Sequence, residues 1–423
     1  MHSAAFRRVF AADVISTFGS LMSRLAIPWL AVLVLDAGPA AMALLAVADV
    51  AAGALAALLL GVVIDRRPKR ASMIACDLLR AAALLAIPLL AWSGHLSIGA
   101  LIAVVGFNGA LTVAFELAQS AWIARHTESD ALAGRNSALA AGSAVTEAAS
   151  FGLTGWIFQL AGAAIAIVAD ALTYVASALL LVRVDETPPP PREQTAGITL
   201  RGALKSFAAE VRDGLQTVVV HPTLRALASI AALTAFGSGF AATTYMIYVA
   251  RDLGFSTGAL GMIFALGGLG SLAGAWGVAN LARRVPPHRL LIAGLFVWAI
   301  GSAAAPLAAS ATVLGALLLC AQQLIGDAGG ITVHIADRTL RQSHTPQTHL
   351  ARVDASIRTV THVFTLAGAL LSGALAEAFG ARPLLFASST LIAIAGAVAL
   401  FTLRAAGENR GTAQPHDPER RAT

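Results

Sequence analysis

The sequence predicts an all-α membrane protein with twelve transmembrane helices arranged in two pseudo-symmetric six-helix halves. Hydrophobic residues make up 57% of the 423 residues and charged residues 12%, whereas soluble domains carry about 25% charged residues. Apolar stretches of about 20 residues, enough to cross a bilayer, recur along the chain. Lipid accepts only helices or closed barrels, and the alternating pattern of barrel strands is missing. We therefore expect a multi-pass helical protein in the lipid bilayer.

Most of the twelve expected spans are joined by short loops, and their many Gly and Ala residues favour close helix packing. The basic pair near the N-terminus leads into an apolar run too long for a cleavable signal, so this run is taken as the first span. The spans are predicted at Val9–Leu35, Ala40–Val63, Ala71–Trp92, Leu96–Gln119, Ser137–Leu160, Ala163–Val182, Leu224–Ala250, Leu260–Leu281, Leu290–Ala308, Val313–Ile335, Asp354–Ala376 and Pro383–Leu403.

The distribution of Lys and Arg predicts that both termini are cytoplasmic. Of the 29 basic residues, 24 fall in the terminal segments and the loops on their side, while the opposite loops hold only Arg251 and Arg382. Such an asymmetry marks the cytoplasmic side. The formal net charge of +6 does not indicate nucleic-acid binding, because the cations are spread over short loops rather than gathered in one patch.

A long polar segment divides the chain into its two halves. It begins with a proline run that is typical of a stiff spacer, and apolar residues then recur at helical spacing from Leu200 to Val218. This pattern predicts an amphipathic helix, lying either on the inner membrane face or against cytosolic loops. The expected units are a six-helix bundle at 1–184, the linker at 185–222, a second bundle at 223–404 and a polar tail at 405–423.

The loop after the second span, GVVIDRRPKR, combines one carboxylate with four cations. It resembles the G-x-L-x-D-R-x-G-R-R loop of the major facilitator superfamily, with Gly61, Asp65, Arg66, Lys69 and Arg70 at matching positions. Pro68 and Val63 depart from the pattern. A weaker copy without the acid, GVANLARRVPPHR, follows the eighth span. The resemblance implies two halves that bind substrate between them near the midplane.

Three further segments are similar to the third drug:proton antiporter family, which includes macrolide exporters. They are ASMIACDLLRAA in span three, EVRDGLQTVVVHPTLRAL in the linker, and DRTLRQSHTPQTHLARVDASIRT between spans ten and eleven. The resemblance implies proton-coupled efflux of amphipathic small molecules by alternating access, across a bacterial inner membrane. We expect a monomer whose partners are substrate, protons and lipid, without cofactor or metal.

Charged residues inside spans are costly, about 2.5–3.5 kcal/mol at a helix centre, and therefore suggest function. Arg24 and Asp49 lie at equal depth in adjacent spans, which predicts a facing pair that either lines the substrate cavity or only joins two helices. Glu147 has no partner on its own helix, so we expect it to carry the coupling proton or to pack against another span. Asp77 and Arg80, three residues apart, are expected to neutralise each other.

Other polar residues in spans are candidates for the substrate or proton pathway. Asp170 lies four residues before Tyr174 on one helix face, where the pair forms either a polar lining or a local hydrogen bond. Gln322, Gln323 and Asp327 add polarity to span ten and are candidates for a cavity wall, and His362 in span eleven either titrates near neutral pH or packs. Aromatic residues such as Phe115 are interpreted as core or lipid-facing.

Asp65 is predicted to latch the cytoplasmic side. It ends span two, while Arg352 and Arg358 lie at the inner end of span eleven in the other half. A carboxylate–arginine pair there would close the inner gate and would have to break for inward opening.

Motifs for other classes of protein are missing. The sequence has no G-x-x-x-x-G-K-[ST], H-E-x-x-H or G-x-S-x-G, so an ATPase or other enzyme is not expected. Its two cysteines suggest neither disulfides nor a metal site. The alternatives that stay open are transport of a specific metabolite or siderophore, in either direction, and a non-transporting receptor or scaffold.

Overall fold

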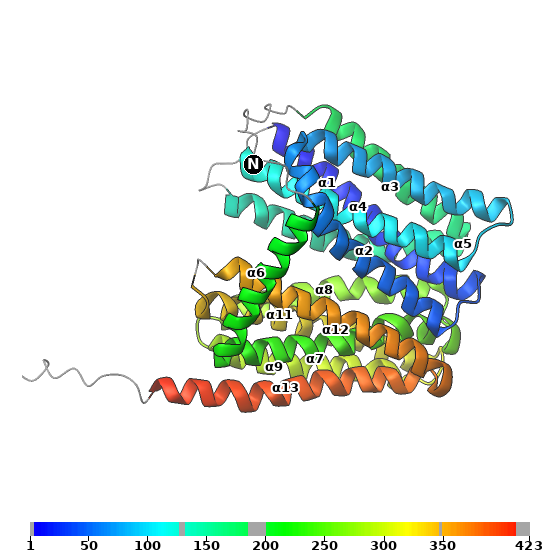
Figure 1. Cartoon of the computed structure of the whole chain (residues 1–423). Helices are drawn as coiled ribbons and strands as arrows, with labels where there is room; N and C mark the ends of the chain where they lie inside the picture. The colour runs from blue at the N-terminus through cyan, green and yellow to red at the C-terminus, as the bar shows by residue number, and fades with distance from the viewer. Residues whose placement is uncertain (1–3, 127–131, 185–199, 347–348, 412–423) are drawn as a thin grey trace, which may run out of the picture.

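The computed structural model describes residues 4–126, 132–184, 200–346 and 349–411, apart from the side chains of some helical residues. All regular structure in these residues is helical, which confirms the predicted fold class (Figure 1). The N-terminal half contains α1 (Ala4–Trp29), η1 (Leu30–Val34), α2 (Pro39–Arg66), α3 (Lys69–Trp92), α4 (Ile98–Arg125) and α5 (Leu132–Val182). After the linker helix α6 (Leu200–Val220), the C-terminal half contains α7 (Pro222–Met246), η2 (Ile247–Asp252), α8 (Thr257–Leu281), α9 (Pro287–Ala304), η3 (Ala305–Leu307), α10 (Val313–Ala321), η4 (Gln322–Gly326), α11 (Asp327–His344), α12 (Leu350–Phe379) and α13 (Ala381–Gly411).

Eleven helices in the described part of the chain are long and apolar enough to cross a membrane. One of them, α5, covers two predicted spans, because the helices on either side of Gly162 follow one another without a loop. Gly162 has a φ of 84°, a left-handed conformation that glycine adopts without steric cost. With α5 divided at this residue, the helices correspond to the twelve predicted spans.

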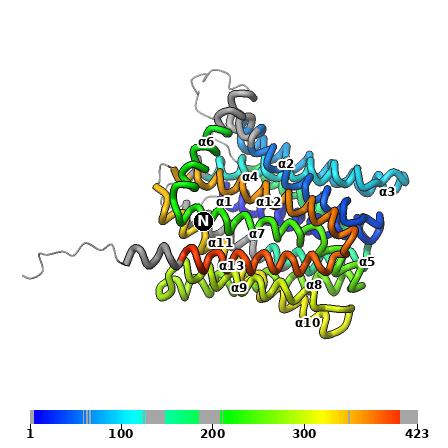
Figure 2. Tube along the Cα trace, turned by 60° about the horizontal axis from the view of Figure 1, so that its bottom comes forward, coloured from blue at the N-terminus to red at the C-terminus, as the bar shows by residue number. Residues whose placement is uncertain are grey.

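The helices of each half pack mainly among themselves. In the first half α5 contacts α1 and α3, and α4 contacts α2 and α3; in the second, α7 contacts α12 and α13, and α11 contacts α8 and α9. The halves meet where α5 crosses α8 and where α12 lies along α2 (Figures 1 and 2).

The crossing of α5 and α8 depends on two glycines that let the backbones touch. A Cβ atom added to Gly261 would lie 2.6 Å from the Cα atom of Gly155. Such close approach of small residues is a common way to pack helices in membranes. The predicted role of glycine in packing is therefore confirmed at this interface.

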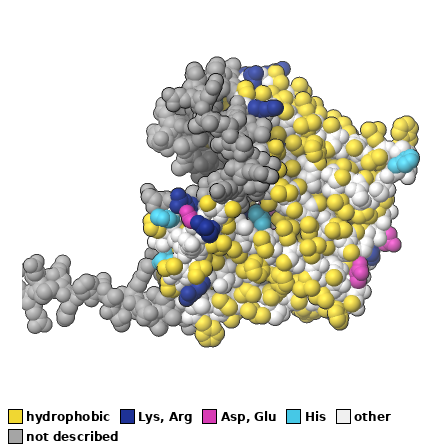
Figure 3. All heavy atoms as spheres, in the orientation of Figure 1, with side chains coloured by type: hydrophobic (Ala, Val, Ile, Leu, Met, Phe, Trp, Pro, Cys, Tyr) yellow, Lys and Arg dark blue, Asp and Glu magenta, His cyan; other side chains and the backbone are white. Residues whose placement is uncertain are grey.

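The molecule has two distinguishable ends. We call the end that carries the first turns of α1, the last turns of α13 and helix α6 the proximal end, and the opposite end the distal end (Figure 1). Apolar side chains cover most of the visible described surface, and most of the Lys and Arg residues in view lie toward the proximal end (Figure 3).

Helix α6 is the predicted linker helix, and its second half packs on the first turns of α12 rather than on a loop. Ser356 donates a hydrogen bond to the carbonyl oxygen of Val211 at 2.9 Å. Arg352, a predicted latch residue, forms an ion pair at 3.5 Å with Asp213 of α6. The linker helix α6 is thus attached to α12, the helix of the C-terminal half that lies along α2.

Candidate binding site

The two halves are joined at the distal end by Arg251, a residue of η2. Its Nη2 donates hydrogen bonds to the carbonyl oxygens of Val32, at 3.1 Å, and Ala37, at 3.0 Å. The same nitrogen lies 2.8 Å from the carboxylate of Asp36. One guanidinium therefore binds three groups at the end of the first span of the other half. Sequence reasoning noted Arg251 only as an outer cation.

A second distal contact joins α5 to the start of α8. The backbone N–H of Gly258 donates to Gln159 Oε1 at 2.8 Å, close to the crossing of the glycines. On the other side of the molecule, a Cβ atom on Gly373 of α12 would lie 2.6 Å from that of Ala43 in α2. We call these contacts, with those of Arg251, the distal seal.

Arg24 and Asp49 have exposed side chains in the first and second spans. The charge of Arg24 acts on the Asp49 carboxylate, yet neither forms an ion pair or hydrogen bond with any residue that the structure describes. Asp49 lies against Gly109 of α4. The predicted pair therefore lies within electrostatic range but is not in direct contact in this conformation. This leaves both charged groups available to a ligand.

Charged groups of opposite halves also lie within electrostatic range of each other. Glu147 of α5 is half-buried and acts on Asp327 of α11. The exposed Glu116 of α4 is influenced by the exposed Arg358 of α12. Sequence reasoning missed Glu116, although an acid within a predicted span was the signal that could have found it.

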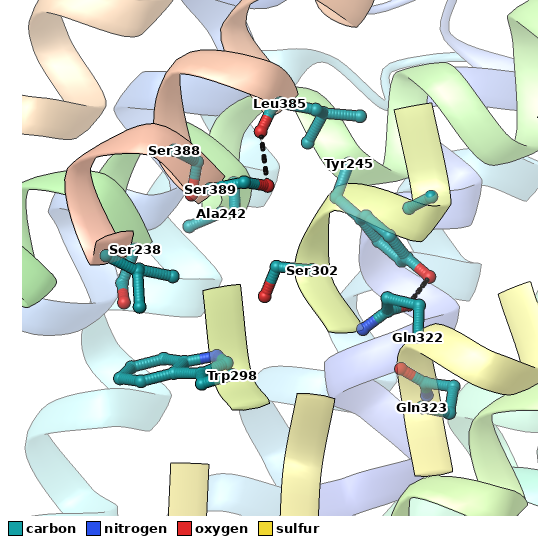
Figure 4. A pocket seen from close by; sticks show the side chains of 13 residues that line it. Ser238, Ala242, Tyr245, Trp298, Ser302, Gln322, Gln323, Leu385, Ser388 and Ser389 are labelled. Atoms are coloured by element: carbon teal, nitrogen blue, oxygen red, sulfur yellow. Dashed lines mark hydrogen bonds between the residues drawn. The ribbon is translucent and has the colours of Figure 1, made fainter. Parts of the chain in front are cut away.

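A cleft of about 350 Å³ lies inside the C-terminal half, between α7 and η4, and is backed by α9 and α13 (Figure 4). None of the side chains that line it is charged. The lining residues are Ser238, Ala241, Ala242, Tyr245, Trp298, Ser302, Ala305, Gln322, Gln323, Leu385, Ser388, Ser389 and Ile392.

Some polar groups in this neutral cleft already have partners. Tyr245 donates to Gln322 Oε1 at 2.6 Å, Ser388 to the carbonyl oxygen of Gly237 at 2.7 Å, and Ser389 to its own helix. Four others form no hydrogen bond with the described residues, namely Ser238, Trp298, Ser302 and Gln323. Of the cleft residues, the sequence had indicated Gln322 and Gln323.

The neutral cleft adjoins a larger cavity, of about 520 Å³, on its proximal side. Both are bordered by Ser238 and Trp298. The larger cavity is lined by charged residues: Arg341 bridges Asp337, at 2.8 Å, and Asp354, at 2.7 Å. Arg358 also lines it. A ligand arriving from the proximal end would therefore pass through this charged cavity before it reached the neutral cleft.

The interior of the N-terminal half is filled by a buried ion pair. Asp77 and Arg80 are 0% and 1% exposed and pair with each other, as predicted. The Arg80 guanidinium carbon lies 4.8 Å from the ring centre of Phe115 and 4.3 Å from that of Tyr174. Cation–π contacts and the ion pair thus occupy this space, and Phe115 is a core residue.

Asp170 and Tyr174 belong to the same packed interior, where both are 0% exposed. Asp170 accepts hydrogen bonds from Ser23 and from Thr173, while the Tyr174 hydroxyl shares one with Ser20 at 2.9 Å. The two residues therefore bond to the first span and to local groups rather than to each other.

In the loop resembling the superfamily motif, Lys69 is buried and donates to the carbonyl oxygen of Ile64. Arg70 donates to the carbonyl oxygen of Val184 at 2.9 Å. Gly61 belongs to α2, and the side chains of Asp65 and Arg66 lie outside the described residues. His362 is half-buried on α12, near Arg358.

The profile described as "Major Facilitator Superfamily" matches residues 9–363. A search of curated proteins gives no match. Solved structures give similar folds at low identity. The nucleoside transporter NupG has a TM-score of 0.75 at 11% identity, over 95% of this chain and 99% of that one.

Two other similar structures are of bacterial transporter homologues. A homologue of the iron transporter ferroportin, in an inward-facing state, has a TM-score of 0.70 at 15% identity and covers 94% of this chain and 99% of that one. A homologue of the lysosomal transporter Spinster, inward-facing and unoccupied, has a TM-score of 0.69 at 15% identity, over 96% and 98%.

Proposed function

The chain belongs to the major facilitator superfamily, and from this premise we propose that it exports amphipathic small molecules in exchange for protons. Membership makes it a multi-pass membrane protein and a secondary transporter that moves a small molecule by alternating access, not an enzyme. The proposal adds the class of substrate, the coupling ion and the direction. It also places both termini in the cytoplasm of a bacterium and takes the monomer as the working unit.

The observation that carries this proposal is the distal seal together with the polar path on the proximal side. Contacts of Arg251 and of Gln159 with Gly258 join the halves at one end, while the charged cavity and neutral cleft lie toward the other. The charge asymmetry supports a cytoplasmic proximal end. An exporter loads its substrate from the cytoplasm in such a conformation.

Proton coupling is supported by acids at the interface of the halves. Glu147 and Asp327 come from opposite halves, and the charge of Glu147 acts on Asp327. A change in the distance between the halves would therefore change this interaction. Two acids that approach each other favour a shared proton, because both cannot easily ionise. We assign Glu147 as the first candidate for the proton carrier, followed by Asp327 and His362.

A second candidate function is transport of one specific polar metabolite. The neutral cleft favours it, because its serine and glutamine side chains present more hydrogen-bonding groups than a purely apolar drug would use.

Transport in membrane vesicles tests the proposal. A host without its own drug exporters would express the protein, and a compound panel would identify substrates by raised resistance. Purified protein in proteoliposomes would then be given an imposed pH gradient. We expect substrate to move against its gradient while protons move the opposite way. Movement that is unaffected by collapsing the pH gradient would refute proton coupling, and no movement of any panel compound would refute efflux of this class.

A further inference from the structure

The two halves are built alike, but their interiors differ. Arg80 and Trp298 each stand eleven residues after the first residue of their helices, Lys69 in α3 and Pro287 in α9. In the first half, Arg80 and its partners fill the space between the helices. In the second half, the corresponding Trp298 borders the neutral cleft.

The chemistry of the cleft selects against charged ligands. No lining residue is charged, and Asp327, whose charge acts on Tyr245, does not line the cleft. An ion entering the cleft would therefore lose water without a counter-charge in direct contact, which is unfavourable. The hydroxyls of Ser238 and Ser302, the indole N–H of Trp298 and the amide of Gln323 form no hydrogen bond with the described residues. A neutral ligand with donors and acceptors would satisfy them, and each such bond favours binding.

The size and shape of the space indicate a ring system. A volume of about 350 Å³ is near the lower end of small-molecule pockets. The aromatic side chains of Trp298 and Tyr245 lie on two sides of it, with Ser302 between them (Figure 4). Aromatic walls favour planar ligands.

We propose that the neutral cleft binds an uncharged ring system that carries hydrogen-bond donors and acceptors. Such a group is the whole of a small substrate or the neutral end of a larger amphipathic one. The inference rests on the proposed function, since it names the chemistry of what the transporter moves. The charged cavity on the proximal side is the route by which the ring enters.

Cysteine protection tests this assignment directly. Because the chain has only two cysteines, Cys76→Ala with Cys320→Ala gives a cysteine-free parent. Ser302→Cys reports on the cleft, and Thr361→Cys in the adjoining cavity is the matched control. Everted vesicles are treated with N-ethylmaleimide in the presence of adenosine, uridine or lumichrome, three neutral heterocycles, or of ethidium, a planar cation. Both single-cysteine variants must first retain the folded elution profile of the parent.

At a probe concentration of about ten times its Kd, the site is nearly full, and alkylation should slow about tenfold. We expect this for at least one neutral heterocycle at Ser302→Cys, with little change at Thr361→Cys and none with ethidium. Protection by none of the three heterocycles, or equal protection by ethidium, overturns the assignment.

Fluorescence provides a second measurement that does not need a cysteine. A protecting heterocycle should quench the tryptophan emission of the parent, and Trp298→Phe should abolish most of that quenching. Trp276→Phe is the control, because Trp276 is 73% exposed on α8. Quenching that survives Trp298→Phe unchanged contradicts the assignment.

The outcomes separate this inference from the proposed function. Protection at Ser302→Cys without proton-driven movement in proteoliposomes supports the ring site and refutes the proposed coupling. Proton-driven export of a panel compound that leaves Ser302→Cys unprotected refutes the ring site and supports the proposed function.

Discussion

Replacement of Arg251 by Ala should open the distal end. The guanidinium loses two hydrogen bonds to the carbonyls of Val32 and Ala37 and an ion pair with Asp36. The side chains of Arg251 and Asp36 are 34% and 92% exposed, so the ion pair contributes well under 1 kcal/mol. Each carbonyl bond from a charged but partly solvated donor contributes about 1 kcal/mol. The closed state should therefore lose about 2 kcal/mol, which changes the ratio of closed to open about thirtyfold.

Asp36→Asn separates the two contributions. Asp36 has a φ of 51°, a left-handed conformation that Asn tolerates, so the loop backbone is preserved. Only the exposed charge is removed, and the ratio should change less than fivefold, since 1 kcal/mol corresponds to about a factor of five. Arg251→Ala should therefore change the ratio of closed to open more than Asp36→Asn does, because it removes the two carbonyl bonds as well as the ion pair.

A distance measurement reads the opening directly. Spin labels on His95→Cys and Ser310→Cys, both exposed positions in distal loops of opposite halves, would be placed in the cysteine-free parent. Double electron–electron resonance should show a longer distance in most molecules when Arg251 is replaced by Ala. A distribution identical to the parent's, or one that Asp36→Asn reproduces in full, would refute the role given to the carbonyl contacts.

Four further substitutions test other parts of the structure. Gly261→Ala should lower the thermal unfolding midpoint by forcing the halves apart, at a cost of about 1–3 kcal/mol, whereas Gly277→Ala, with nothing within 4 Å of the added Cβ, should not. Arg80→Met leaves a buried carboxylate unpaired and should reduce stability by about 3–5 kcal/mol; an unchanged denaturation curve would contradict that view. Asp65→Asn should leave a folded protein but favour inward opening about fivefold and slow turnover, as about 1 kcal/mol at a water interface implies; an unaltered cytoplasmic distance and export rate would remove the latch. Glu147→Gln should abolish uphill export and keep substrate binding, and wild-type efflux would transfer the proton role to another acid.

The fold could be predicted from the sequence because membrane insertion imposes simple rules. The length and order of the apolar segments locate the helices, and even the short connection at Gly162 falls between two predicted spans. The pairing of Asp77 with Arg80 followed from their spacing on one helix. These features are local in the chain, so periodicity and spacing are sufficient to find them.

Features made by distant segments could not be predicted in this way. Arg251 binds carbonyl groups more than 200 residues away, and backbone acceptors leave no trace in residue types. The neutral cleft combines small polar residues such as Ser302, which look like ordinary packing residues in a transmembrane helix. The charge of Arg24 acts on Asp49, but a prediction of equal depth does not determine whether the two side chains touch.

The widened end of the first span gives Arg251 its acceptor. Just after η1, a π-helix, the N–H of Ala37 bonds back to the carbonyl of Ala31 at 2.8 Å. This leaves the carbonyl of Val32 to receive Arg251 at 3.1 Å. Rewinding this turn as an α-helix would displace one residue and rotate all that follows by about 100° with a shift of about 1.5 Å. A screw motion of that size would carry Asp36 and Ala37 away from the guanidinium. We therefore expect any change in the helical pitch of η1 to move the acceptors of Arg251 and so to weaken the closure of the distal end.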